Sequence, residues 1–337
     1  MIDRGRAGRS FVYRGGVRLA GTVVACDAAT GSDLVFLSHA PALGARGRRA
    51  LPHLGSGSRQ ILATDVTLAL LGPAGERMRR HALVAAPGRP FSLGELRLEL
   101  YASGFMPGSA SLLCERGGRR LGYSGPLGAG PGVDVRAADA VCLDARGATA
   151  APTPPAAEAL ASVEGAVRAL LADGRAPVVV AASSSRSLEI GGALAGDRIV
   201  LRGHRSIVQA AAAYRDAGLP APPVARFDRR LGAGEVLLWP AGERLPGQRA
   251  GGRTPGVVLI GDAGTASPGG PDAIALPFPE RAGLAALVGY VAATGASEIA
   301  IVNAPDGELI RALGARGLDA YMIGPPRQAS LFEANAA

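Results

Sequence analysis

Side chains that could hold a catalytic metal are sparse in this sequence. The chain has four histidines, and His39 is the one that follows a strand-like apolar run, where a loop could aim it into a site. A catalytic Zn²⁺ or Mn²⁺ takes about three protein ligands. His53, His81 and His204 form no second cluster with ligand spacing, although His53 follows the same loop and is the best stand-in. His39 and the acidic residue Asp144 together offer two ligands, which is too few for a site with two such ions.

Arginine supplies the positive charge of the chain. The sequence has 36 basic residues, all of them arginine, against 28 acidic residues, which leaves a net charge of +8. Such a chain attracts polyanions, because guanidinium forks match the oxygens of a phosphate. Arg46, Arg48 and Arg49 could form a phosphate clamp that replaces the charge of metal ions, and Arg186 is a further nucleic-acid-binding candidate. The alternative is a solvated loop in an arginine-biased protein.

Composition and cysteine spacing restrict the class of protein. A hydrophobic content of 48% excludes a disordered chain. Cys26, Cys114 and Cys142 lie far apart, each within or beside an apolar run, which predicts buried thiols rather than metal ligands or disulfides. No apolar stretch reaches the roughly 18 residues that cross a bilayer, and the N-terminus leads into no signal-like core. We therefore expect a cytoplasmic protein with no membrane partner.

The pattern of apolar runs changes near the middle of the chain. Short runs in the first part predict strands at 21–26, 34–37, 60–63, 96–102, 110–115, 120–123 and 140–143, with a helix beginning near Thr64. A boundary at 149–155, rich in Ala, Thr and Pro, precedes a helix that runs to about 173. Strands and helices then alternate, which favours a parallel α/β unit. The tail predicts a helix at 281–294, a strand at 298–302, a helix at 306–316 and a strand at 318–323.

Five segments follow one another in this order: 35–40 (VFLSHA), 103–110 (SGFMPGSA), 122–126 (GYSGP), 144–147 (DARG) and 276–282 (LPFPERA). Together they resemble the metallo-β-lactamase fold with a β-CASP insertion, the architecture of many nucleases. Three more are similar to the bacterial ligase-associated DNA exonuclease branch: 185–189 (SRSLE), 201–204 (LRGH) and 293–296 (ATGA). The resemblance implies an α/β fold, an αββα sandwich carrying an inserted β-CASP α/β domain. Residues 1–155 would begin the sandwich, 156–265 form the insertion, and 266–337 complete the sandwich.

The same resemblance implies two zinc or manganese ions, which activate a water and stabilise the charge on the attacked phosphate. His39 stands at the first position of the family's His-x-His-x-Asp-His loop, and Asp144 keeps the acidic residue that begins the β-CASP region. Other residue types stand at the remaining ligand positions: Pro41, Leu43, Gly44, Phe105, Pro126, Arg281 and Asn303. We therefore expect no catalytic residues and no metal cofactor, with His39 and Asp144 as vestiges.

The resemblance then implies a catalytically inactive homologue that serves DNA or RNA processing as an accessory protein. It would bind DNA or RNA, or pair with an active β-CASP paralogue, a ligase or a helicase. Two alternatives stay open, namely a metal-dependent nuclease that relies on His39, Asp144 and His53, and a scaffold that touches no nucleic acid. The more apolar vacated cleft could also hold a small ligand.

The two vestigial side chains need new partners in such a protein. A relic His39 ring is expected to hydrogen-bond a loop carbonyl. The carboxylate of Asp144 needs an N–H group or an arginine once the metals are gone, because an unpaired buried charge costs folding energy. Arg146 and Arg281 are the candidates for that role.

Overall fold

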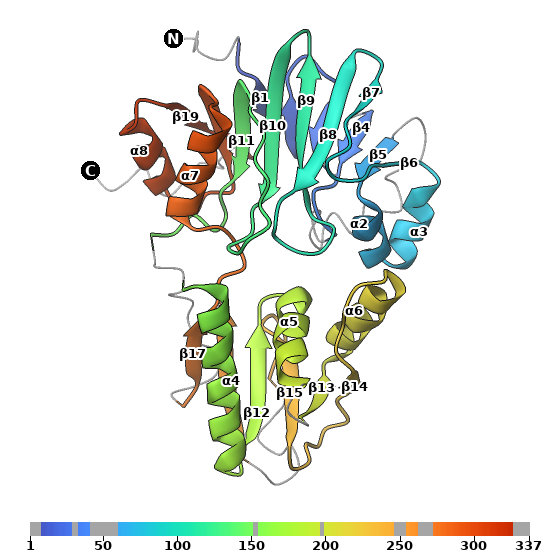
Figure 1. The fold of residues 1–337 in the computed structure, drawn as a ribbon, viewed down its shortest axis with the longest axis vertical. Helices are drawn as coiled ribbons and strands as arrows, with labels where there is room; N and C mark the ends of the chain where they lie inside the picture. The colour runs from blue at the N-terminus through green and yellow to red at the C-terminus, as the bar shows by residue number, and fades with distance from the viewer. Residues whose placement is uncertain are drawn as a thin grey trace, which may run out of the picture.

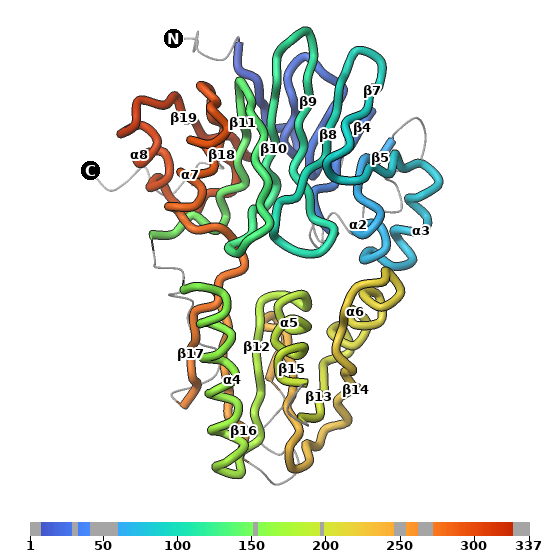
Figure 2. Tube along the Cα trace, in the orientation of Figure 1, coloured from blue at the N-terminus to red at the C-terminus, as the bar shows by residue number. Residues whose placement is uncertain are grey.

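The fold contains three β-sheets arranged in two bodies (Figure 1). The computed structural model describes residues 8–28, 33–40, 60–150, 154–195, 199–245, 254–261 and 272–325. Two sheets face each other in one body, and the third forms the core of the other. The chain enters the second body after β11 and returns from it after β17 (Figure 2).

The first sheet has six strands in sequential order. They are β1 (Phe11–Tyr13), β2 (Val17–Leu19), β3 (Val24–Cys26), β4 (Leu34–Phe36), β5 (Gln60–Ala63) and β6 (Ala82–Val84). The strands from β3 to β6 are parallel, so their carboxyl ends meet at one edge. Helices α2 (Asp65–Leu70) and α3 (Pro73–Arg79) follow β5, and the Thr64 hydroxyl caps α2 by accepting from the Thr67 N–H, as an N-cap threonine does.

The second sheet has seven strands in the order β19-β18-β11-β10-β9-β8-β7. They are β7 (Phe91–Leu93), β8 (Leu96–Ala102), β9 (Ala110–Arg116), β10 (Arg119–Pro126), β11 (Ala140–Asp144), β18 (Glu298–Val302) and β19 (Asp319–Met322). Strands β7 to β10 form an antiparallel meander, while β10, β11, β18 and β19 are parallel. Segments far apart in the sequence therefore share this sheet, and α7 (Leu284–Thr294) and α8 (Glu308–Gly314) accompany its last strands.

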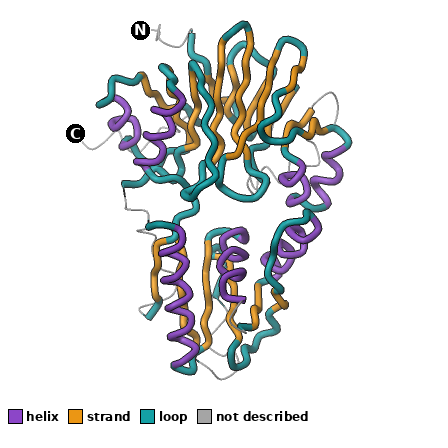
Figure 3. The backbone as a smooth tube through the Cα atoms, viewed as in Figure 1, coloured by secondary structure: helices purple, strands orange, loops and turns teal. Residues whose placement is uncertain are grey.

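Alternating apolar side chains of the two sheets meet in one core. Leu98 of β8, Leu112 of β9 and Leu34 of β4 all belong to this cluster, as do the three cysteines, which are buried and free. The prediction of buried thiols is confirmed. Helices α7 and α8 pack on the outer side of the second sheet, and α2 and α3 on that of the first. Figure 3 shows these helices flanking the strands of this body, which has four layers.

The third sheet is fully parallel and has the strand order β14-β13-β15-β12-β16-β17. Its strands are β12 (Ala176–Ala181), β13 (Val200–Gly203), β14 (Val224–Arg226), β15 (Glu235–Pro240), β16 (Pro255–Gly261) and β17 (Ile274–Pro277). Helices α4 (Ala156–Ala172), α5 (Ser184–Leu194) and α6 (Arg205–Asp216) share one hydrophobic core with it. The predicted alternation of strands and helices after the boundary is confirmed.

The α/β class is confirmed, and several elements differ in extent from their predictions. The helix expected from residue 281 begins at Leu284, because Arg281 pairs with Gly128 as an isolated antiparallel bridge. The expected division between 265 and 266 falls between β16 and β17, two paired strands of the third sheet. Among the described residues, no helix is both long and apolar enough to cross a membrane.

Candidate functional site

The candidate site lies at the carboxyl edge of β3 and β4, where two parallel strands bring Asp27 beside Ser38. Ser38 donates its backbone N–H to Asp27 Oδ1 at 2.8 Å and its hydroxyl to Oδ2 at 2.6 Å. The Tyr123 hydroxyl, from β10 of the facing sheet, donates to Oδ2 at 2.8 Å. Burial raises the pKa of Asp27 to about 6, although these hydrogen bonds act to lower it.

His39 continues this network at the same edge. Its Nδ1 lies 2.8 Å from Ser38 Oγ, so its partner is a hydroxyl rather than the predicted loop carbonyl. The Ser38 hydroxyl has one proton and donates it to Asp27. In its hydrogen bond with His39 the hydroxyl oxygen must therefore accept from Nδ1–H, so the neutral ring carries its lone pair on Nε2. Burial lowers the pKa of His39 to about 3, and the positive charges of Arg281 and Arg146 contribute. The ring is therefore neutral at physiological pH.

Phe105 packs against the His39 ring, and Arg281 lies over Phe105. The phenyl and imidazole rings meet edge to face, with centroids 5.4 Å apart and an interplanar angle of 86°. The Arg281 guanidinium carbon lies 4.4 Å from the centroid of the same phenyl ring, a cation–π contact. Both residues stand at positions where the family resemblance places metal-binding histidines. A phenyl ring and a guanidinium thus lie beside His39.

Asp144 ends β11 next to this cluster, and its side chain is buried. Its backbone N–H donates to Ser124 Oγ at 3.0 Å, and its Oδ1 accepts from the Arg146 backbone N–H at 3.2 Å. Arg146 was expected as a partner and is one, through its backbone rather than through an ion pair in the described structure. Pro126, paired with Asp144 in the sheet register, supplies no carboxylate.

Two arginines bring positive charge to this edge. Among the described residues, no three His, Cys, Asp or Glu side chains gather where they could hold a metal ion. Arg146 and Arg281 place two positive charges near His39, and both depress its pKa. Arg146 is exposed, so its guanidinium can reach a ligand from solvent. The two guanidinium groups could attract an anion to this edge.

The remaining predicted site residues lie elsewhere. Arg186 is buried in α5, where its guanidinium lies over the Phe278 ring at 3.6 Å, donates to the Pro279 carbonyl at 2.9 Å and pairs with Glu189. Asn303 is exposed just after β18 and takes a left-handed φ of 61°, a conformation that asparagine tolerates. Other predicted residues lie outside the described residues: Pro41, Leu43, Gly44, Arg46, Arg48, Arg49 and His53.

Asp27 is the part of this site that sequence reasoning missed. Asp27 directly follows β3, and Ser38 lies two residues after the end of its parallel neighbour β4. The signal in the sequence was an acidic residue directly after a short apolar run. The left-handed φ of 49° at Asp27 lets the chain turn at the strand end.

Neither the models of known protein families nor the curated proteins contain a match to this chain.

Proposed function

We propose that the protein is a non-hydrolytic member of the metallo-β-lactamase fold with a β-CASP insertion, and that it binds nucleic acid as an accessory factor. The order of the five sequence segments and the four-layer body beside a parallel α/β body support this proposal. The single observation that carries it is the Arg281 guanidinium, which lies over Phe105 beside His39. A fixed positive charge there can attract the phosphate that metal ions attract in the active family.

The nucleic-acid part of the proposal also draws on net charge. The chain carries +8, and its cations are all arginines, which bind phosphate oxygens through paired N–H groups. The exposed Arg146 and the adjacent Arg281 would contact the backbone of a strand that enters this edge. Such contacts release counterions, so binding must weaken steeply as salt rises.

The test is binding of fluorescently labelled single-stranded and duplex DNA and RNA, followed by anisotropy over a series of salt concentrations. Arg146→Gln should weaken binding and lower the salt-dependence slope by roughly 0.7 to 0.9 for each phosphate that the side chain no longer neutralises. Arg215→Gln, at an exposed position of α6, is the matched control and should change neither quantity. The proposal also predicts that none of these nucleic acids is cleaved with added Zn²⁺ or Mn²⁺.

Two results would overturn the proposal in different ways. Stoichiometric zinc or manganese in the purified protein, with EDTA-sensitive degradation of DNA or RNA, would establish a metal-dependent nuclease. Absence of binding to every nucleic acid at low salt would leave a scaffold function instead.

A further inference from the structure

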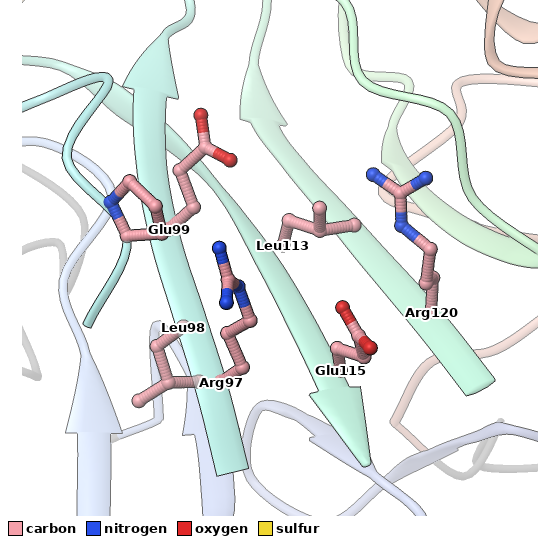
Figure 4. Close-up of a pocket in the computed structure, with 7 residues that line it drawn as sticks. Arg97, Leu98, Glu99, Leu113, Glu115 and Arg120 are labelled. Atoms are coloured by element: carbon pink, nitrogen blue, oxygen red, sulfur yellow. The ribbon is translucent and has the colours of Figure 1, made fainter. Parts of the chain in front are cut away.

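A pocket of about 240 Å³ lies on the outer face of the second sheet, at β8, β9 and β10 (Figure 4). Leu96, Leu98 and Leu100 of β8 point into the core between the sheets, so the alternate residues Arg97 and Glu99 point outward. Side chains of all three strands line the pocket: Arg97, Glu99, Leu113, Glu115 and Arg120. The pocket is therefore distinct from the strand edge that carries His39.

Three charged side chains cross the floor of this pocket in a row. Arg97 and Glu115 are direct cross-strand neighbours, and so are Glu115 and Arg120, which places the carboxylate between two guanidinium groups (Figure 4). Adjacent strands are about 4.8 Å apart, so the two arginine Cα atoms are separated by roughly 10 Å. Long, flexible arginine side chains can close that separation from both sides.

The three charged side chains lie on neighbouring strands without direct contact between their charged groups in the described structure. Within the described part of the chain, no ion pair of 4.0 Å or less joins Glu115 to Arg97 or to Arg120. Arg120 Nε is also shielded from solvent without an acceptor among those residues. By contrast, Glu99 is occupied, since its Oε1 accepts from Arg136 Nε at 2.7 Å. Among the described residues neither Arg97 nor Arg120 forms an ion pair, so their terminal guanidinium N–H groups can donate to an incoming carboxylate.

We propose that this pocket binds an acidic α-amino acid. Its two carboxylates would lie on Arg97 and Arg120, its ammonium group on Glu115, and its methylene groups over Leu113. The ligand then carries negative, positive and negative groups against the positive, negative and positive row of the sheet. Guanidinium forks bind carboxylates through two parallel hydrogen bonds. The volume is below the 300 to 1,000 Å³ of ordinary ligand sites, which restricts the occupant to a small molecule.

Glu115 distinguishes this ligand from a simple anion. A dicarboxylate without an ammonium group would place negative charges near the Glu115 carboxylate with no positive group between them, so Glu115 would repel it. An amino acid with one carboxylate would leave Arg97 or Arg120 without a partner. Both carboxylates and the ammonium group are therefore needed together. This inference is independent of nucleic-acid binding, because the pocket and the His39 edge share no residue.

The test is isothermal titration calorimetry of the full-length protein with L-glutamate, L-aspartate, L-glutamine and glutarate. We expect L-glutamate or L-aspartate to bind about tenfold more tightly than L-glutamine and glutarate, each of which lacks one charged group. Arg120→Gln should weaken binding of the preferred amino acid at least tenfold. Glu115→Gln should weaken it similarly and tighten binding of glutarate, which reverses the preference. Arg215→Gln again serves as the control.

Circular dichroism and thermal unfolding of each variant will show that the fold is intact, which we expect because the substitutions are on the sheet surface. Three results would each overturn the proposal: absence of heat with both acidic amino acids at millimolar concentration, equal affinity of wild-type protein for L-glutamate and glutarate, or an unchanged preference in Glu115→Gln. The last result would show that Glu115 does not contact the ligand.

Discussion

Replacing His39 by glutamine tests whether His39 is a buried neutral ring in the folded protein. Glutamine can still hydrogen-bond Ser38 Oγ, but it removes the titrating ring and part of the edge-to-face contact with Phe105. At neutral pH we expect His39→Gln to lower the free energy of unfolding by about 1 to 2 kcal/mol, as is usual when core packing is weakened.

The pH dependence of the unfolding free energy shows how much the neutral His39 ring contributes to stability. Burial lowers the pKa of His39 from 6.5 to about 3, so as pH falls through 6.5 the unfolded chain takes up a proton there and the folded protein does not. Stability present above pH 6.5 is therefore lost on acidification. Each pH unit below 6.5 removes about 1.36 kcal/mol while the folded ring stays neutral, so the loss between about pH 7.5 and about pH 5 is about 2 kcal/mol. His39→Gln does not suffer this loss, so its deficit relative to wild type should disappear near pH 5.

Asp27 acts in the opposite direction. Its pKa is raised to about 6, so the stability that it contributes is present below its ordinary value of 3.8 and is lost as pH rises through about 6. This effect is common to wild type and His39→Gln, and it largely cancels when the two are compared. It also predicts that wild-type stability changes little between about pH 6 and about pH 4, where the two slopes oppose each other.

Urea denaturation followed by circular dichroism at several pH values measures these differences. His81→Gln, at an exposed position outside the network, is the matched control for loss of a histidine. A difference in unfolding free energy between His39→Gln and wild type that stays constant from pH 7.5 to pH 5 would refute the reasoning. In that case the His39 ring would be titrating in the folded protein much as it does in the unfolded chain.

Two further predictions test the packing beneath the site. Gly128→Ala should destabilise the fold by more than about 2 kcal/mol in urea denaturation, because the added Cβ would lie 2.0 Å from the Gly104 carbonyl oxygen. Gly130→Ala, whose Cβ would meet nothing within 4 Å, should stay within about 0.5 kcal/mol of wild type, and equal effects would contradict this packing. The thiols of Cys26, Cys114 and Cys142 should react with a colorimetric thiol reagent only after denaturation, because all three are buried and burial raises their pKa. Rapid reaction of the native protein would contradict this placement.

Much of the fold could be predicted from local patterns. The strands Gln60–Ala63, Leu96–Ala102 and Glu298–Val302 have their predicted bounds. The helix predicted to begin near Thr64 is capped by that residue, whose side chain accepts from the Thr67 N–H. The strands that were missed, such as β1, β2, β6 and β7, have three residues each. Three residues are too few to show the two-residue period of a strand.

The site could be predicted only in part, for a physical reason. Residue types alone determined that the chain has four histidines and that its cations are arginines. Contacts between distant segments decided the rest. Asp27 meets Ser38 because β3 and β4 are parallel and end at one edge. Arg281 lies over Phe105, and it also forms an isolated bridge with Gly128. Strand order and register set such contacts, and neither is written in any local stretch of sequence.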